Sequence, residues 1–433
     1  MAENFQLEKK LMQVYDGSAD RDGISGSRLA KRLGELSQIG RTEDNGSKRP
    51  GFSLEEKAAK DLVMDWMREA GLEVKQDGAG NVFGRLVGKN DSLPAVLSGS
   101  HVDSVPNGGH FDGPLGVLAA LEVAQAWKDA GYQPEKPYEV VIFSDEEGSR
   151  FQGGFNGSEA MMGYIDLEEK KKLNDTEGRS FEEVLADVGL TPEGFLEAKR
   201  SPEEIDMFVE VHIEQGKRLE KENLPCGIVT GIAGPSFLEL TFTGQAGHAG
   251  NTPMNDRQDP LVAASEFIYQ VNQLPRKVSE SAVATVGKMH VEPNGINVIP
   301  GKVTVFVDVR DIAENTRDTL LSQVEGLANS ISGKHGIGLE CEEKMRITPV
   351  PIEEETQQLL EKAVESNDIR PYRLPSGAGH DSMIIGTKLP IAMLFTKSKD
   401  GISHNPDEWS DLKDCVETVH VLKTFLESKV SGS

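Results

Sequence analysis

Five short clusters of histidine and acidic residues hold the side chains of this sequence that could do chemistry. They lie at residues 99–104, 111–113, 143–148, 212–216 and 401–406. Imidazoles and carboxylates without thiolates suit Zn²⁺, Mn²⁺ or Co²⁺ better than a structural zinc site built on cysteines. One carboxylate can bridge two ions, and two ions polarise a carbonyl and acidify the water between them. The clusters therefore predict a two-metal hydrolase.

The adjacent carboxylates Glu146 and Glu147 indicate a division of labour. On an extended turn, the side chains of neighbouring residues point in different directions. One of the two can therefore bind a metal while the other stays free to act as a general base. A Glu-Glu pair alone is most often solvated surface, so this interpretation depends on the four other clusters.

The first part of the chain alternates predicted helices with predicted strands, and most of the clusters follow strands. The pattern predicts helices at 54–70 and 114–130 and buried strands at 81–87, 95–98 and 138–143. This alternation is typical of an α/β layer with a largely parallel sheet. In such open sheets, functional residues gather beyond the carboxyl ends of the strands. The sheet is thus expected to bring the clusters to one edge.

The pattern changes after about residue 233. The order of predicted elements becomes β-α-β-β-α-β, which fits a small open sheet with two helices on one face. We therefore predict an α/β protein in which an inserted, smaller α+β domain, residues 234–348, interrupts a catalytic domain formed by residues 1–233 and 349–433. The inserted elements are predicted at 238–243, 260–274, 282–291, 302–309, 317–332 and 338–343.

Composition and charge exclude several classes of protein. The 433 residues include 46 Lys and Arg against 71 Asp and Glu, a formal net charge of −25. So acidic a chain is not expected to bind nucleic acid or an anionic membrane surface. No stretch approaches the roughly 20 apolar residues of a membrane span, and the first residues lack the apolar core of a secretory signal. With three widely spaced cysteines, these features predict a cytoplasmic protein.

Seven short motifs run along the chain: Gly-Ser-His-x-Asp, Phe-Asp-Gly-x-x-Gly, Glu-Glu-Gly-Ser-Arg-Phe, His-Ile-Glu-Gln-Gly, Gly-His-Ala-Gly-x-Thr-Pro-Met, Asn-x-Ile-Pro-Gly and Gly-x-Ser-His. Together they resemble the hydantoinase/carbamoylase branch of the two-metal amidohydrolases, relatives of carboxypeptidase G and the aminoacylases. The resemblance runs from about residue 28 to the C-terminus. It implies a two-metal catalytic domain with an inserted lid through which two copies of the chain form a homodimer.

The resemblance implies a role for each polar residue at the predicted strand ends. Two divalent ions, Zn²⁺, Mn²⁺ or Co²⁺, would be bound in each subunit and would share one bridging carboxylate. Glu146 would act as general base and then as general acid, and Asp103 would orient the imidazole of His101 through its other ring nitrogen. The implied ligands are His101 and His212 for one ion, Glu147 and His404 for the other, and Asp112 as the bridge.

The resemblance also implies residues that contact the substrate. A lid histidine would reach the active site of the partner subunit and stabilise the oxyanion. A glutamine would contact the ureido end, an asparagine and an arginine would clamp the substrate carboxylate, and two backbone groups would complete the site. In this sequence these residues are His248, Gln215, Asn297, Arg310, Gly377 and Ala378.

The substrate class follows from the same resemblance, with alternatives. The motifs are most similar to those of enzymes that cleave N-carbamoyl-L-amino acids to an L-amino acid, ammonia and carbon dioxide. Allantoate and N-carbamoyl-β-alanine are alternative substrates for the same site, and residues 152–156 depart from the more apolar loop expected. Arg310 and Gln215 argue against an aminopeptidase or dipeptidase, and the intact ligand set argues against a catalytically dead binding protein. His110 and His380 receive no role.

Overall fold

The computed structural model describes residues 6–151 and 153–431. Gln152, the first residue of the atypical loop 152–156, lies outside the described residues. The chain divides into two compact units. The first takes in the chain up to Val229, Ile352–Leu374 and the chain from His380 onward, and the second takes in Thr230–Pro351 and Pro375–Gly379.

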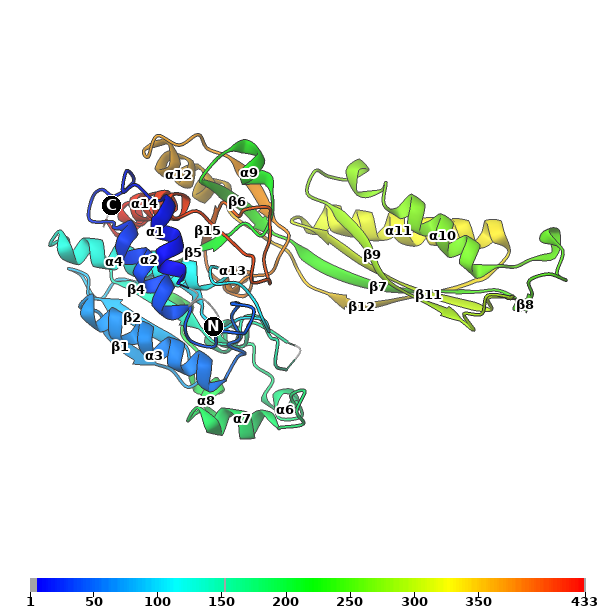
Figure 1. Ribbon diagram of the computed structural model, residues 1–433, viewed down its shortest axis with the longest axis horizontal. Helices are drawn as coiled ribbons and strands as arrows, with labels where there is room; N and C mark the ends of the chain where they lie inside the picture. The colour runs from blue at the N-terminus through cyan, green and yellow to red at the C-terminus, as the bar shows by residue number, and fades with distance from the viewer. Residues whose placement is uncertain (1–5, 152, 432–433) are drawn as a thin grey trace. The chain divides into compact units, whose positions relative to one another are not determined.

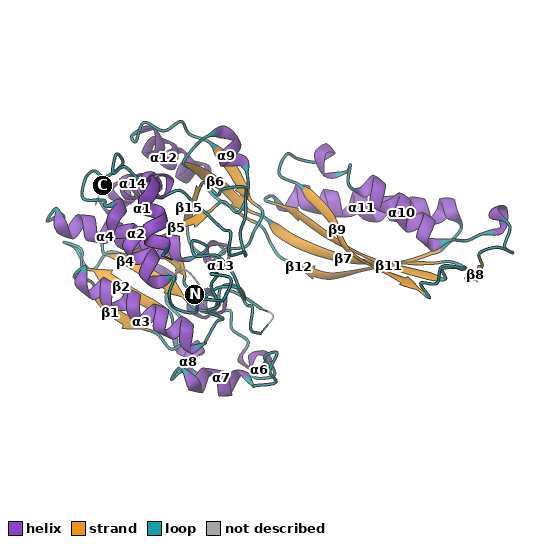
Figure 2. Ribbon diagram, in the orientation of Figure 1, coloured by secondary structure: helices purple, strands orange, loops and turns teal. Residues whose placement is uncertain are grey.

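A sheet with parallel strands at its centre runs through the first unit (Figures 1 and 2). The neighbours β4-β3-β5-β15 are parallel and almost wholly buried, as expected of apolar strands covered on both faces. The outer pairs are antiparallel. The predicted α/β class with a mostly parallel central sheet is therefore confirmed. The strand order is β1 (Glu73–Gln76), β2 (Val82–Leu86), β4 (Tyr138–Phe143), β3 (Ala95–His101), β5 (Ile205–Ile213), β15 (Ile391–Thr396), β6 (Cys226–Ile232) and β13 (Val350–Pro351), with β14 (Arg373–Ser376) beside β6.

Helix α4 (Pro114–Asp129) covers the central strands of this sheet. It packs on β3 and β5, and nearly all its residues are buried because its sequence is apolar on all sides. Pro114 lies in its first turn, and Gly131, with a φ of 64°, follows its end. The other helices of the unit are α1 (Leu7–Val14), α2 (Gly26–Leu36), α3 (Leu54–Glu69), α5 (Asn156–Met162), α6 (Leu167–Lys170), α7 (Phe181–Asp187), α8 (Gly194–Glu197), η1 (Pro202–Glu204), α9 (Arg218–Glu222), α12 (Glu354–Glu365), α13 (Asp381–Ile385) and α14 (Leu412–Val430).

An aromatic cluster anchors the loop that follows β4. Phe151 is buried, and its ring lies edge-on to Phe181 with centroids 5.3 Å apart. Phe181 in turn packs edge-on against Phe52 at 5.9 Å. Arg150 donates a hydrogen bond to the carbonyl of Phe52. Packing of Phe151 and the hydrogen bond of Arg150 therefore hold the loop after β4 in place.

The second unit is an antiparallel sheet in the order β12-β7-β11-β9 with two helices on one face. Leu240 lies opposite Val305, so the apolar side chains of β7 and β11 share a face and pack against α10 and α11. No helix among the described residues of either unit is long and apolar enough to cross a membrane. The elements are β7 (Gly234–Thr243), β8 (Gly247–His248), η2 (Met254–Asp256), α10 (Pro260–Val271), η3 (Pro275–Lys277), β9 (Val283–Glu292), β10 (Val298–Ile299), β11 (Lys302–Asp311), α11 (Glu314–His335) and β12 (Gly338–Arg346).

Candidate metal centre

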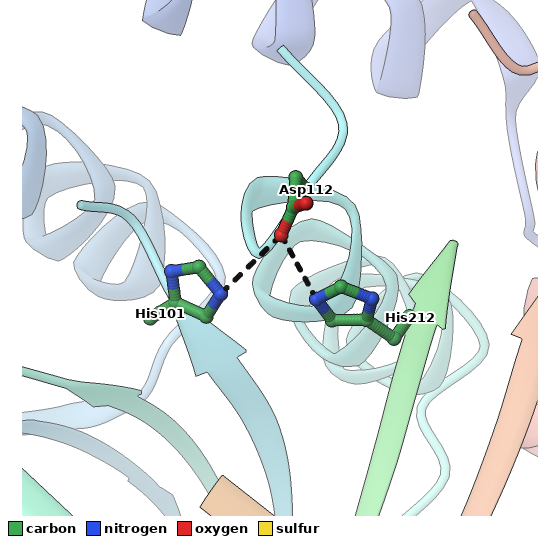
Figure 3. A group of neighbouring side chains, drawn as sticks. All are labelled: His101, Asp112 and His212. Atoms are coloured by element: carbon green, nitrogen blue, oxygen red, sulfur yellow. Dashed lines mark ion pairs between the residues drawn. The ribbon is translucent and has the colours of Figure 1, made fainter. Parts of the chain in front are cut away.

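Two imidazoles and one carboxylate meet at the carboxyl ends of the parallel strands (Figure 3). His101 ends β3, His212 lies near the end of β5, and Asp112 stands in the turn before α4. The Nε2 atom of His212 lies 3.1 Å from Asp112 Oδ1, and that of His101 lies 3.7 Å from the same oxygen. All three residues are buried. Neighbouring parallel strands thus place both imidazoles on one side of a shared carboxylate.

A second group lies on the other oxygen of Asp112. His404 Nε2 is 3.5 Å from Asp112 Oδ2 and 3.4 Å from Glu147 Oε2. His404 is half-exposed and comes from the loop after β15, whereas Glu147 follows β4. In each group, the candidate ligand atoms lie within 4.8 Å of one another. The arrangement around the two Asp112 oxygens is that of a carboxylate able to bridge two cations.

The ring nitrogens of the two buried imidazoles are set up for metal binding. His101 Nδ1 lies 3.2 Å from the carbonyl oxygen of Asp103, and His212 Nδ1 lies 3.0 Å from that of Ile213. Because a carbonyl only accepts hydrogen bonds, Nδ1 carries the proton and Nε2 presents its lone pair. His101 Nε2 is buried and has no hydrogen-bond partner among the described residues. A lone pair that faces a carboxylate fits a cation between them.

Asp103 holds the turn that carries the two glutamates. Its Oδ1 and Oδ2 accept hydrogen bonds from the backbone N–H groups of Glu146 at 3.2 Å and Glu147 at 3.1 Å. Its Oδ1 also lies 3.3 Å from His101 Nδ1. One buried carboxylate therefore fixes both an imidazole and the glutamate turn. Residues of this kind behind a metal centre commonly set the orientation of its ligands.

Glu146 is buried beside the first group but belongs to neither group. Its Oε2 lies 3.7 Å from His101 Nε2. Burial raises the pKa of Glu146 well above its ordinary value, His101 opposes the shift, and Glu147 adds to it. Burial would also raise the pKa of Asp112, but His212 and His101 hold it well below its usual range. Bound cations would favour the ionised form of each nearby carboxyl.

Three polar side chains contact Asp112 in ways that the sequence does not reveal. Gln215 Nε2 donates to Asp112 Oδ2 at 2.7 Å, and its Oε1 has no hydrogen-bond partner among the described residues. Ser403 also donates to this oxygen. The buried Glu408 accepts from the backbone N–H of Asp112 at 3.1 Å. Burial raises the pKa of Glu408 to about 7, Asp112 adds to the shift, and the backbone N–H donors oppose it.

His248 and Asn297 lie together in the second unit. His248 on β8 pairs with Val298 on β10, and the N–H of Ala249 donates to the carbonyl of Asn297 at 3.0 Å. His248 Nδ1 accepts from the N–H groups of Gly250 and the following residue at 3.1 and 3.2 Å. Its proton therefore sits on Nε2, which makes the exposed side of the ring a hydrogen-bond donor.

Arg310 lies near the end of β11 in the second unit. Asp308 accepts hydrogen bonds from its Nε and Nη2 at 2.8 to 3.1 Å. Its Nη1 donates to the carbonyl of Gly377 at 2.7 Å, and Ser376 donates to the carbonyl of Ala378. The structure thus brings Arg310 together with the loop that contains both predicted backbone contacts.

Two histidines without an assigned role, His110 and His380, are buried. The His380 ring lies 4.5 Å from that of His212, centroid to centroid, and burial and His212 lower the pKa of His380 well below its ordinary value. His110 Nε2 bonds to the carbonyl of Asn45 at 2.8 Å, and burial lowers the pKa of His110 to about 4. His380 thus packs as a neutral ring against His212, and His110 holds the loop that contains Asn45.

Comparisons with known proteins show which family this chain resembles. The model of peptidase family M20/M25/M40 matches residues 97–428. The chain is 44% identical to an N-carbamoyl-L-amino acid amidohydrolase of Geobacillus stearothermophilus, over 92% of this chain and 97% of the relative. It is 36% identical to an allantoate amidohydrolase of Bacillus subtilis, over 90% of this chain and 94% of the relative. A solved amidase of the hydantoinase/carbamoylase family from Burkholderia multivorans superimposes with a TM-score of 0.88 and 35% identity, over 94% of this chain and 98% of that one.

Proposed function

The chain belongs to peptidase family M20/M25/M40, a family of metal-dependent hydrolases, and we propose that it hydrolyses the ureido C–N bond of N-carbamoyl-L-amino acids. The observation that carries this proposal is the carboxylate of Asp112, whose two oxygens face two separate groups of ligands. The substrate class is supported by the relative that is 44% identical over 92% of the chain.

The donor set fits two divalent cations, and Zn²⁺, Mn²⁺ or Co²⁺ are the ions that we propose. When bound, such ions would polarise the ureido carbonyl and acidify the attacking water. The residues proposed to hold them are His101 and His212, Glu147 and His404, and Asp112 between the two pairs.

Glu146 supplies the proton transfers in this proposal. It accepts the proton of the attacking water and passes it to the leaving nitrogen, so that one carboxyl serves as base and then as acid. Its burial and its place outside both ligand groups support this role. The products are the L-amino acid, ammonia and carbon dioxide.

The substrate contacts proposed for the second unit follow the chemistry of each side chain. His248, with its proton on Nε2, would donate to the developing oxyanion in the site of a partner subunit. Asn297 and Arg310 would bind the substrate carboxylate, and the backbone of Gly377 and Ala378 would line the same end. Dimerisation through the second unit is part of the proposal.

A panel of substrates tests the proposal. Ammonia release is measured with N-carbamoyl-L-methionine, its D-enantiomer, N-carbamoyl-β-alanine and allantoate, with added Mn²⁺, Co²⁺ or Zn²⁺, and a dipeptide is scored by amine release. Turnover of the L-compound but not of the D-form is the expected result. The relative that acts on allantoate, at 36% identity, makes allantoate the second candidate. A clear preference for it would move the substrate assignment and keep the centre.

A further inference from the structure

Glu408 is a buried acid beside the proposed metal centre. It is 3% exposed. Its Oε1 accepts hydrogen bonds from the backbone N–H groups of Phe111 at 2.7 Å and Asp112 at 3.1 Å. Burial of a carboxylate is costly, so its place here calls for a gain elsewhere. The two N–H groups belong to the turn that carries Asp112, so Glu408 stabilises that turn.

A second connection runs from Glu408 to the side chain of Asp112. Glu408 Oε2 lies 3.0 Å from Ser403 Oγ, and Ser403 Oγ lies 2.5 Å from Asp112 Oδ2. The hydroxyl has a single hydrogen, so Ser403 donates to one of the two carboxylates at a time while it lies within hydrogen-bond distance of both. Glu408 therefore contacts both ends of the same residue: the peptide nitrogen directly, and the carboxylate oxygen through Ser403. The backbone and side chain of Asp112 are held together.

The backbone at Gly109 is shaped to admit Glu408. A Cβ at this position would lie 2.1 Å from Oε1 and from Cδ of Glu408, far inside van der Waals contact. The φ of Gly109 lies outside the left-handed region, so the glycine is needed for the space that Glu408 occupies. A methyl group at position 109 would therefore displace the side chain of Glu408 without a substitution of Glu408 itself.

We propose that Glu408 is a positioning residue that sets Asp112 in the orientation needed to bridge two cations, an inference that rests on the metal centre proposed above. Asp112 stands in a turn rather than on a strand, so strand pairing does not fix its backbone. The contacts from Glu408 and Ser403 fix which oxygen faces His404. Partners behind metal ligands typically change metal affinity by 10–100-fold when removed.

The test is the affinity of chelator-treated full-length protein for Co²⁺, read by visible absorption and by competition with a chelator of known affinity. Glu408→Ala and Gly109→Ala should each weaken Co²⁺ binding by roughly 10–100-fold. Glu408→Gln should bind at or near the affinity of the unchanged protein. The amide oxygen still accepts from both N–H groups, and its NH₂ donates to Ser403.

The matched control is Glu122→Ala. Glu122 is also fully buried and also accepts from a backbone N–H, that of Ser25, but it lies among arginines away from the centre. Its loss should lower the melting temperature and leave Co²⁺ affinity unchanged. Should Glu408→Ala fail to fold, Gly109→Ala and Ser403→Ala give the comparison.

Two results would overturn the role. One is a Glu408→Ala protein that binds Co²⁺ as tightly as the unchanged protein. The other is an equal loss of affinity in Glu122→Ala, which would make the effect one of general stability. Failure of the unchanged protein to bind Co²⁺ is distinguishable from both, because it would overturn the metal centre itself and this role with it.

Discussion

Replacing each of the adjacent glutamates by glutamine should cause two different losses. Glu147 Oε2 lies 3.4 Å from His404 Nε2 and belongs to a ligand group, whereas Glu146 belongs to neither group. Glu146→Gln should lower kcat by about 100- to 10,000-fold, the range for loss of a general base. This corresponds to roughly 3–5 kcal/mol in activation free energy. Its metal content should stay unchanged. Glu147→Gln should lose metal, because an amide is a far weaker ligand than a carboxylate.

The comparison is sharp because both substitutions remove one negative charge from the same turn. Both backbone N–H groups are held by Asp103, so neither change should release the turn itself. Ammonia release and metal content are measured on the same preparation of each variant. A Glu146→Gln protein with a near-normal rate would refute its role as base. A Glu146→Gln protein that loses metal as Glu147→Gln does would refute the division between the two residues.

Three further predictions concern the second unit and the acid stability of the first. Arg310→Ala should raise KM by roughly tenfold to a hundredfold, the loss of a charged hydrogen bond, with little change in kcat; steady-state kinetics showing an unchanged KM would contradict this. His248→Ala should lower kcat by about 100- to 1,000-fold, and an effect confined to KM would argue against an oxyanion contact. Burial would raise the pKa of Glu139, but Arg200 and Arg85 hold it below its ordinary value. Its contribution to stability is therefore present above about pH 4 and is lost as the pH falls through the depressed folded pKa. Arg200→Ala should cost about 2 kcal/mol at pH 7, and urea unfolding should show that deficit shrinking in acid; a deficit that is constant with pH would refute the assignment.

The elements that carry the centre were predictable from local sequence. The helix expected at 114–130 is observed as Pro114–Asp129, because its apolar run, its first-turn proline and its final glycine are all local signals. The strand end at Phe143 was predicted in the same way, whereas the strand predicted at 95–98 continues to His101. Since parallel strands align their carboxyl ends, the clusters at those ends were expected to lie close together. The individual ligands were implied only by the family resemblance.

Contacts between distant parts of the chain were not predictable in this way. Glu408 bonds to Phe111, 297 residues away in sequence, and a glutamate in a loop looks like solvated surface until that partner is known. The amide of Gln215 lies on Asp112, which no spacing in the sequence encodes.

The most direct test of the account is the metal dependence of ammonia release from N-carbamoyl-L-methionine. The protein is treated with a chelator, dialysed, and titrated with Mn²⁺ or Co²⁺ while the rate is followed. We predict loss of activity on chelation and recovery that is complete near two equivalents per chain, because Asp112 is shared by two ligand groups. Activity that survives complete removal of metal, or that never appears with any of the ions, would contradict it.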